Sequence, residues 1–201
     1  GCMLSAASCN KWWMDEIIKT KEYSEEQKPI TDDMLGNNRV FFLPYLMGER
    51  SPHNNPAARA TFTGMTMDTE RKDMTQAVLE GVAFSLLHSK KKLGMLGLSC
   101  AAEATLIGGG SKSRLWGQIL ADCLGIGLRI TESSDSSLGS AMLAGVAVGV
   151  FGSFEKAVEK CVHVKDHIVP RKENTEKYEA LFTTYEKIHD ALAPVYHGEE
   201  R

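Results

Sequence analysis

The stretch Ala104-Thr-Leu-Ile-Gly-Gly-Gly-Ser-Lys-Ser113 joins a short apolar segment to an amphipathic one. Residues 104–107 predict a short buried strand, and residues 113–124 predict a helix. Three consecutive glycines allow backbone conformations that a β-carbon would forbid, and they let a flat ligand approach the main chain. The start of the following helix, capped by Ser111 or Ser113, favours an anionic phosphate. The inward face of that helix is expected to carry Leu115, Trp116, Ile119, Leu120 and Cys123.

The glycines alone leave two interpretations open, a loop that holds a nucleotide and a tight turn without a ligand. The spacing is not that of a Walker A loop, because Gly-x-x-x-x-Gly-Lys-Ser/Thr is absent. It is not the Gly-x-Gly-x-x-Gly pattern of dinucleotide-binding folds either. The choice between the two interpretations therefore depends on the rest of the chain.

Predicted strands and helices alternate on both sides of this stretch. Residues 20–38 and 48–59 are polar and carry proline or glycine, so loops are expected there. Apolar residues of segment 71–92 recur at spacings of three and four, which places one helix face towards the core. Further helices are expected at 4–18, 137–149, 154–160 and 173–192, and strands at 40–43, 60–66, 128–131 and 163–169. This alternation favours an α/β domain with a partly parallel sheet.

The composition is that of an ordinary globular domain. The chain has 201 residues, of which 43% are hydrophobic, and a net charge of −3, so no nucleic-acid or membrane partner is expected. No apolar run reaches the ~18 residues of a membrane span, and the first residues lack the basic segment of a signal peptide. The five cysteines are odd in number and lack Cys-x-x-Cys spacing, which disfavours disulfides and favours a cytoplasmic protein.

No catalytic centre and no metal site stands out in the sequence. His53 lies beside Asn54 and Asn55, where a structural turn is the favoured interpretation, and the other histidines are scattered. Neither Glu80 nor Asp122, both on predicted helices, stands out as a general base, and Glu80 is interpreted as structural. The small residues of segment 137–141 favour close helix packing over ligand contact. The sequence thus presents a nucleotide-type loop without a catalytic group of its own.

Several motifs resemble those of the FGGY carbohydrate kinases. Ala60-Thr-Phe-Thr-Gly-Met65 with Asp73-Met-Thr-Gln-Ala-Val-Leu-Glu80 resembles the second signature of that family. Residues 108–113 resemble its Gly-Gly-Gly-Ala-Lys-Ser nucleotide loop, and residues 137–141 resemble its Ala-Leu-Gly-Ala-Ala helix start. Residues 41–59, with Gly48-Glu-Arg-Ser-Pro-His53, are similar to the xylulokinase branch of the family. The resemblance covers about residues 2–192.

The resemblance implies a fold, an activity and a second domain. Residues 1–201 would form the C-terminal nucleotide-binding domain, a ribonuclease-H-like α/β domain of the actin-like ATPase and sugar kinase superfamily, with a mixed sheet flanked by helices. Members transfer the γ-phosphate of ATP to a sugar, here D-xylulose, in the cleft between two domains. The catalytic aspartate and most sugar contacts would lie in a preceding N-terminal domain, with Mg²⁺ held mainly through the nucleotide and that domain. This chain alone is therefore expected to be inactive.

The resemblance also implies which residues surround the adenosine. One group belongs to the glycine loop, and the other to a helix near the N-terminus that lines the same cleft. The matching positions are Gly108, Gly109, Gly110, Ser113, Ala7, Lys11 and Trp12. Ala7 stands where relatives often have glycine, and Ser111 replaces the usual alanine of the loop.

Two alternatives stay open beside the xylulose kinase. One is another kinase of the same family, acting on ribulose, gluconate or glycerol, and the other is a non-catalytic, actin-like nucleotide-binding module. A domain without its partner would expose an apolar face, for which Trp12, Trp13 and nearby methionines are the candidates. Such a face favours association, so a homodimer is also expected.

Overall fold

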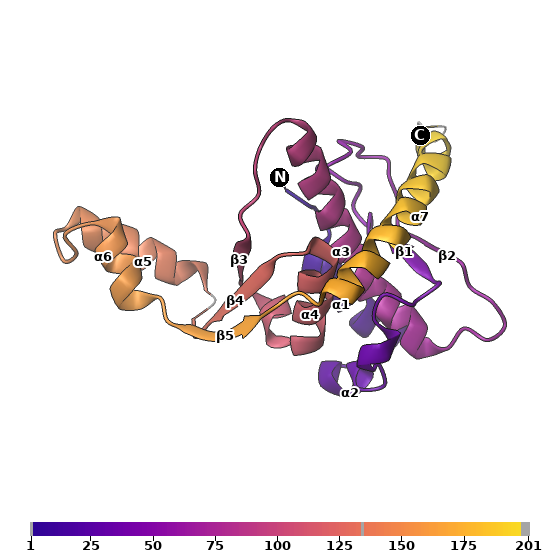
Figure 1. Ribbon diagram of the computed structural model, residues 1–201, viewed down its shortest axis with the longest axis horizontal. Helices are drawn as coiled ribbons and strands as arrows, with labels where there is room; N and C mark the ends of the chain where they lie inside the picture. The colour runs from indigo at the N-terminus through magenta and orange to yellow at the C-terminus, as the bar shows by residue number, and fades with distance from the viewer. Residues whose placement is uncertain (1, 134, 198–201) are drawn as a thin grey trace.

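The computed structural model of the chain describes residues 2–133 and 135–197. Two small sheets and crossing helices form the body, and a helical hairpin projects from one end (Figure 1). The helices are α1 (Ala6–Trp12), α2 (Tyr23–Gln27), α3 (Arg71–Met95), α4 (Arg114–Leu124), α5 (Ser136–Ala147), α6 (Phe154–Cys161) and α7 (Lys172–His197). The strands are β1 (Phe41–Leu43), β2 (Thr61–Thr63), β3 (Glu103–Leu106), β4 (Gly127–Thr131) and β5 (Val164–Ile168).

The larger sheet has the strand order β3-β4-β5. β3 and β4 are parallel, from Glu103 opposite Gly127 to Leu106 opposite Ile130, and β5 runs antiparallel to β4. Helix α4 joins the parallel pair, as a crossover connection requires. β1 and β2 form a separate antiparallel pair. The expected α/β domain with a mixed sheet is confirmed, and the three glycines follow the carboxyl end of β3.

Helix α3 runs through the core of the body. Residues 75–85 of this helix are all buried, so the helix buries its whole circumference there and not only the expected inward face. Tertiary packing explains this burial, because β1, α4 and α1 pack against the same helix from different sides. At Gly81 an added β-carbon would lie 2.2 Å from the carbonyl oxygen of Phe42, so only glycine allows α3 to approach β1 this closely.

The two tryptophans near the N-terminus pack against the core. Helix α1 continues into a π-helical turn over residues 13–17. Trp13 is 5% exposed, and its indole N–H donates to the hydroxyl of Thr75 at 2.9 Å. The ring of Trp12 stacks on Phe42, with centroids 6.2 Å apart. The expectation of an exposed apolar face is therefore wrong for Trp13, whereas Trp12 is half-buried.

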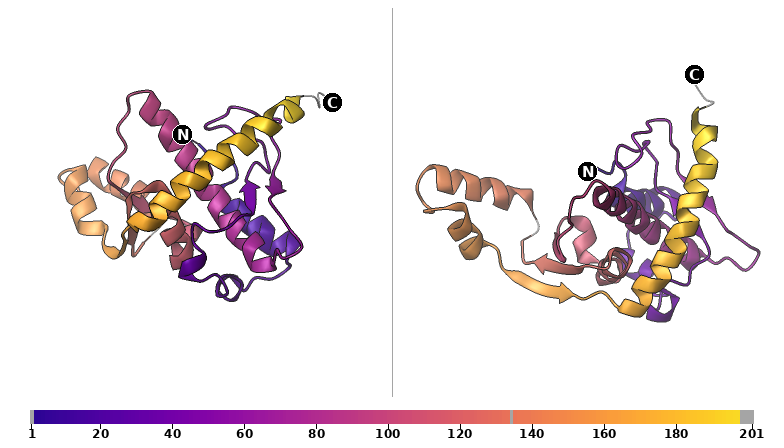
Figure 2. Two further views of the ribbon diagram at one scale, coloured as in Figure 1. Left: turned by 45° about the vertical axis from the view of Figure 1, so that its right-hand side comes forward. Right: turned by 45° about the horizontal axis from the view of Figure 1, so that its top comes forward.

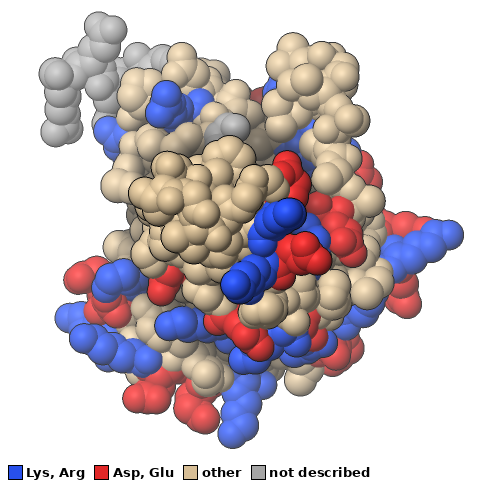
Figure 3. All heavy atoms as spheres, turned by 90° about the vertical axis from the view of Figure 1, so that its left-hand side faces the viewer, with Lys and Arg blue, Asp and Glu red and all other residues tan. Residues whose placement is uncertain are grey.

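Helices α5 and α6 form the hairpin that stands away from the body (Figures 1 and 2). No residue of α5 is buried, and the helix packs on α6, with Gly145 against the ring of Phe151. The close packing expected for residues 137–141 is not found there, since Gly139 has no atom within 4 Å of an added β-carbon, and the close contact of the hairpin lies at Gly145. Figure 3 views the molecule from this end and shows a broad surface of uncharged residues, with charged residues gathered mainly below it. None of the helices in the described part of the chain combines the length and hydropathy needed to cross a membrane.

Candidate functional site

The glycine loop turns the chain from β3 into α4. Gly108 has φ +81°, a conformation that a side chain disfavours, and residues 109–112 form a short 3₁₀ turn. Ser113 is the N-cap of α4, since its hydroxyl oxygen accepts the backbone N–H of Trp116 at 3.1 Å. The predicted serine cap is confirmed, and the free N–H groups of the first helical turn lie next to the loop.

A cavity of about 950 Å³ opens beside this loop. Three segments line it, namely helix α1, the region of α2, and the glycine loop with the start of α4. A volume of this size accommodates a small organic ligand. The lining residues are Ala7, Ser8, Asn10, Lys11, Tyr23, Ser24, Gln27, Lys28, Ile30, Gly109, Gly110, Lys112, Ser113, Arg114, Leu115 and Trp116.

Most of the residues predicted from the sequence meet at this cavity. Ala7 and Lys11 come from α1, whereas Gly109, Gly110 and Ser113 come from the loop about a hundred positions later. Two predicted residues do not line it. Gly108 precedes the 3₁₀ turn, and the ring of Trp12 stacks on Phe42.

Gly109 is open towards space, whereas its neighbour is covered. A β-carbon added to Gly109 would meet no atom within 4 Å. At Gly110 the same atom would lie 3.3 Å from the ring of Trp116. The main chain at Gly109 is therefore accessible to a flat ligand in the cavity.

The charged side chains that line the cavity are all cationic. They are Lys11, Lys28, Lys112 and Arg114, and no carboxylate is among the lining residues of the described chain. Lys11 forms an ion pair with Asp15, and Arg114 forms one with Asp166. Together with the positive end of α4, this arrangement suits an anionic ligand such as a phosphate.

Helix α2 supplies a wall that the sequence did not indicate. Residues 20–38 were expected to be a loop, and the expectation is wrong for the five residues of α2 and for a 3₁₀ turn at 32–34. Five residues are too few for a helical period to appear in the pattern of apolar side chains. Gln27 at the end of α2 is 7% exposed, and it accepts a hydrogen bond from the hydroxyl of Ser113 at 2.6 Å.

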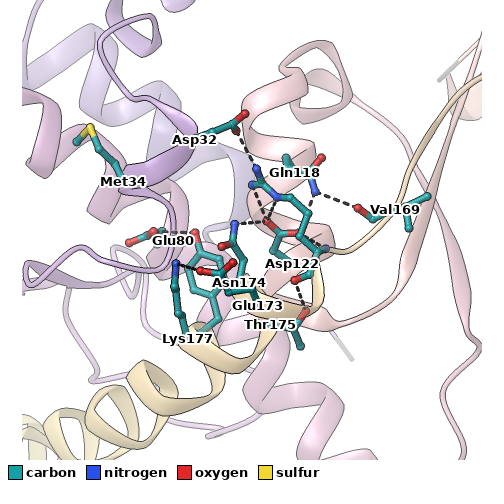
Figure 4. Close-up of polar contacts among 12 residues, drawn as sticks. Asp32, Met34, Glu80, Gln118, Asp122, Val169, Glu173, Asn174, Thr175 and Lys177 are labelled. Atoms are coloured by element: carbon teal, nitrogen blue, oxygen red, sulfur yellow. Dashed lines mark hydrogen bonds and ion pairs between the residues drawn. The ribbon is translucent and has the colours of Figure 1, made fainter.

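The two buried carboxylates on α3 and α4 do not line the cavity, and they hold helices together (Figure 4). Asp122 accepts hydrogen bonds from the backbone N–H and guanidinium of Arg171 and from Asn174, at 2.7–3.0 Å. Glu80 accepts the hydroxyl of Tyr178 at 2.8 Å. Burial raises the pKa of Glu80 to about 7. Both carboxylates join α7 to the body, which agrees with a structural interpretation.

Three of the six histidines, His53, His88 and His189, form a packed cluster, so the expectation that the histidines other than His53 are scattered is wrong for His88 and His189. The rings of His53 and His189 stack with centroids 3.6 Å apart, and His88 meets His53 edge-on at 4.7 Å. Burial lowers the pKa of His53 to about 3 and that of His88 to about 4. His53 and His88 are therefore uncharged near neutrality. Within residues 2–133 and 135–197, no group of His, Cys, Asp and Glu is arranged to hold a metal ion.

Known proteins are similar in sequence to this chain. The model of the FGGY family of carbohydrate kinases, C-terminal domain, matches residues 2–148. The xylulose kinase of Staphylococcus epidermidis is 32% identical over 190 residues, which make up 94% of this chain and 38% of that protein. The chain thus spans about two fifths of the length of this curated relative.

Solved structures share the fold. The xylulose kinase from Rhodospirillum rubrum matches with a TM-score of 0.79 and 25% identity, over 98% of this chain and 40% of that one. The Plasmodium falciparum glycerol kinase, solved with ADP, matches with a TM-score of 0.74 and 24% identity, over 93% of this chain and 38% of its own. These likenesses confirm the expected fold class.

Proposed function

Because the chain belongs to the FGGY family of carbohydrate kinases, we propose that it is the ATP-binding part of a kinase that phosphorylates D-xylulose. One observation carries the proposal: the glycine loop typical of the family lines a cavity whose charged side chains are all cationic. The similarity to xylulose kinases favours D-xylulose as the sugar. Since the chain spans about two fifths of such a relative, the proposed enzyme includes a further domain.

The residues present fit a nucleotide. The open main chain at Gly109 admits the flat face of a base or ribose, and the cavity volume of about 950 Å³ suffices for a nucleoside. Lys112 lies in the 3₁₀ turn that leads to α4, within the positive field of that helix end. The proposed contacts are those of Ala7, Lys11, Gly109, Gly110 and Ser113.

The role of this chain in the proposed reaction is positioning. Phosphoryl transfer depends mainly on orientation and on neutralising the charge of the phosphates. No carboxylate lines the cavity in the described chain, so a Mg²⁺ ion would be held by the nucleotide phosphates and by the further domain. Closure of the cleft between the domains would exclude water, which otherwise competes for the phosphoryl group.

A coupled ATP-consumption assay with D-xylulose tests the proposal. The assay compares this chain with a polypeptide extended to the full length of the relatives. The extended protein is expected to consume ATP only when D-xylulose is present, and the 201-residue chain is expected to consume none. Turnover by the 201-residue chain alone would contradict the assignment of a positioning role.

The same assay separates the rival functions. Turnover with gluconate, ribulose or glycerol but not with D-xylulose would support a kinase of the same family that acts on a different substrate. Glycerol is included among the substrates because the fold is similar to that of a glycerol kinase. Nucleotide binding without turnover on any of these substrates by the extended protein would favour a non-catalytic, actin-like module.

A further inference from the structure

Gln27 and Ser113 form a polar pair across the cavity. The hydroxyl of Ser113 donates to the side-chain oxygen of Gln27 at 2.6 Å, and both residues line the cavity. The pair joins the end of α2 to the first residue before α4, two segments that lie far apart in the chain. Because Gln27 is only 7% exposed, its side chain is held in place and faces the cavity rather than bulk water.

The pair has hydrogen-bonding groups that the described protein does not use and that a ligand can contact. A serine hydroxyl has one donor and two acceptor sites. Ser113 uses its donor on Gln27 and one acceptor site on the N–H of Trp116, so one acceptor site is left. The amide nitrogen of Gln27 makes no hydrogen bond with the described residues, and it is not enclosed by protein. The pair therefore presents one acceptor beside one free donor. Turning the amide over exchanges the two roles and leaves the same combination.

We propose that Gln27, together with Ser113, binds the 6-amino edge of the adenine base, so that Gln27 is a specificity-determining residue of the nucleotide site. This inference rests on the proposed nucleotide-binding function. Adenine carries an amino donor at C6 next to the acceptor N1, which complements an adjacent acceptor and donor. Tyr23, on the same helix as Gln27, also lines the cavity and offers an aromatic face for a base.

The test compares two ligands that differ at a single group. ATP and purine riboside triphosphate have the same phosphates, sugar and ring system, but the latter lacks the 6-amino group. Isothermal titration of the wild-type chain with both ligands gives the ratio of their dissociation constants. We expect ATP to bind about tenfold more tightly, since a pocket acceptor is left unpaired by the other ligand.

Two variants at position 27 locate the effect. In Gln27→Met the affinity for ATP is expected to fall about tenfold with little change in the ratio, because the lost amide donor faces N1, which both ligands carry. Gln27→Glu has the same size and places a carboxylate lone pair against N1, so its affinity for ATP is expected to fall about tenfold. Glu25→Asp, an exposed position of the same helix that does not line the cavity, is the control and is expected to bind ATP like the wild type. Thermal unfolding of each variant confirms that it is folded.

The outcomes separate this inference from the function on which it rests. Failure of the wild-type chain to bind either ligand would overturn the proposed nucleotide site itself. Equal binding of both ligands by the wild type would overturn the pairing with the 6-amino edge, and unchanged ATP affinity in a folded Gln27→Met variant would overturn the role of Gln27, each while leaving nucleotide binding intact.

Discussion

Replacing Glu80 by glutamine should change how the stability of the protein depends on pH. Glu80 lies in the middle of α3 and is 2% exposed. Its Oε1 accepts hydrogen bonds from the amide of Gln76 and the hydroxyl of Tyr178, each at 2.8 Å, and both donors are uncharged. Burial outweighs these hydrogen bonds, so the pKa of Glu80 rises from 4.5 to about 7.

The direction in which stability changes with pH follows from proton binding by Glu80. Between pH 4.5 and about 7 the folded protein keeps the proton on Glu80, whereas the unfolded chain releases it. The free energy of unfolding therefore decreases as the pH rises through this window, and it levels off above the folded pKa. A difference of about 2.5 units corresponds to roughly 3 kcal/mol. Glutamine is uncharged at every pH, and its oxygen can accept the same two hydrogen bonds.

Urea unfolding of the wild type and Glu80→Gln, measured at several pH values from about 5 to about 8, tests this reasoning. As the pH rises across this series, the unfolding free energy of the variant should increase relative to that of the wild type by up to about 3 kcal/mol. Taking the difference in unfolding free energy between the two proteins removes the contributions of other titrating groups, which the two proteins share. Glu159→Gln is the control, because Glu159 is exposed on α6. The difference in unfolding free energy between this variant and the wild type should stay constant within about 0.5 kcal/mol across the pH series. A constant difference for Glu80→Gln as well would refute the argument, since the buried carboxyl would then not titrate in this range.

Two further changes test the packing of the core. Gly81→Ala should destabilise the protein by about 3 kcal/mol, because the new methyl group meets the backbone oxygen of Phe42, whereas Gly94→Ala in the same helix has open space and should stabilise by about 0.5 kcal/mol. Comparable melting temperatures for the two would contradict the close approach of α3 and β1. Asp122→Asn should cost about 3 kcal/mol in urea unfolding, because its carboxylate accepts the backbone and guanidinium of Arg171 at once. A loss under about 0.5 kcal/mol would show that this contact does not hold α7 in place.

The central strand–loop–helix unit could be predicted from the sequence because its signals are local. The apolar segment before the glycines, the Ser113 cap and the amphipathic pattern of residues 113–124 each act within a few positions. The structure places β3 and α4 within one residue of the expected ranges, whereas the expectation that this strand is buried is wrong, because the residues of β3 are exposed or half-buried. The same locality explains why the resemblance of the glycine loop to a nucleotide loop led to residues that do line a cavity.

The features that the sequence did not reveal depend on distant contacts. Trp12 and Trp13 are apolar residues whose direction is decided by Phe42 and Thr75. The burial of α3 on all sides depends on several elements that pack around it. Gln27 lies in a helix of five residues and acquires its place at the cavity only through Ser113. No local pattern carries this information.

The central claim is that the cavity at the glycine loop binds ATP, and Gly109→Ala tests it most directly. The added methyl group would enter the cavity without touching another atom, so the fold should be unchanged and the affinity for ATP should fall by at least about tenfold. Gly139→Ala, a glycine of α5 that has equally open surroundings and does not line the cavity, is the matched control and should bind like the wild type. Equal ATP affinity in the wild type and a folded Gly109→Ala variant would contradict the account, because the nucleotide would then bind elsewhere.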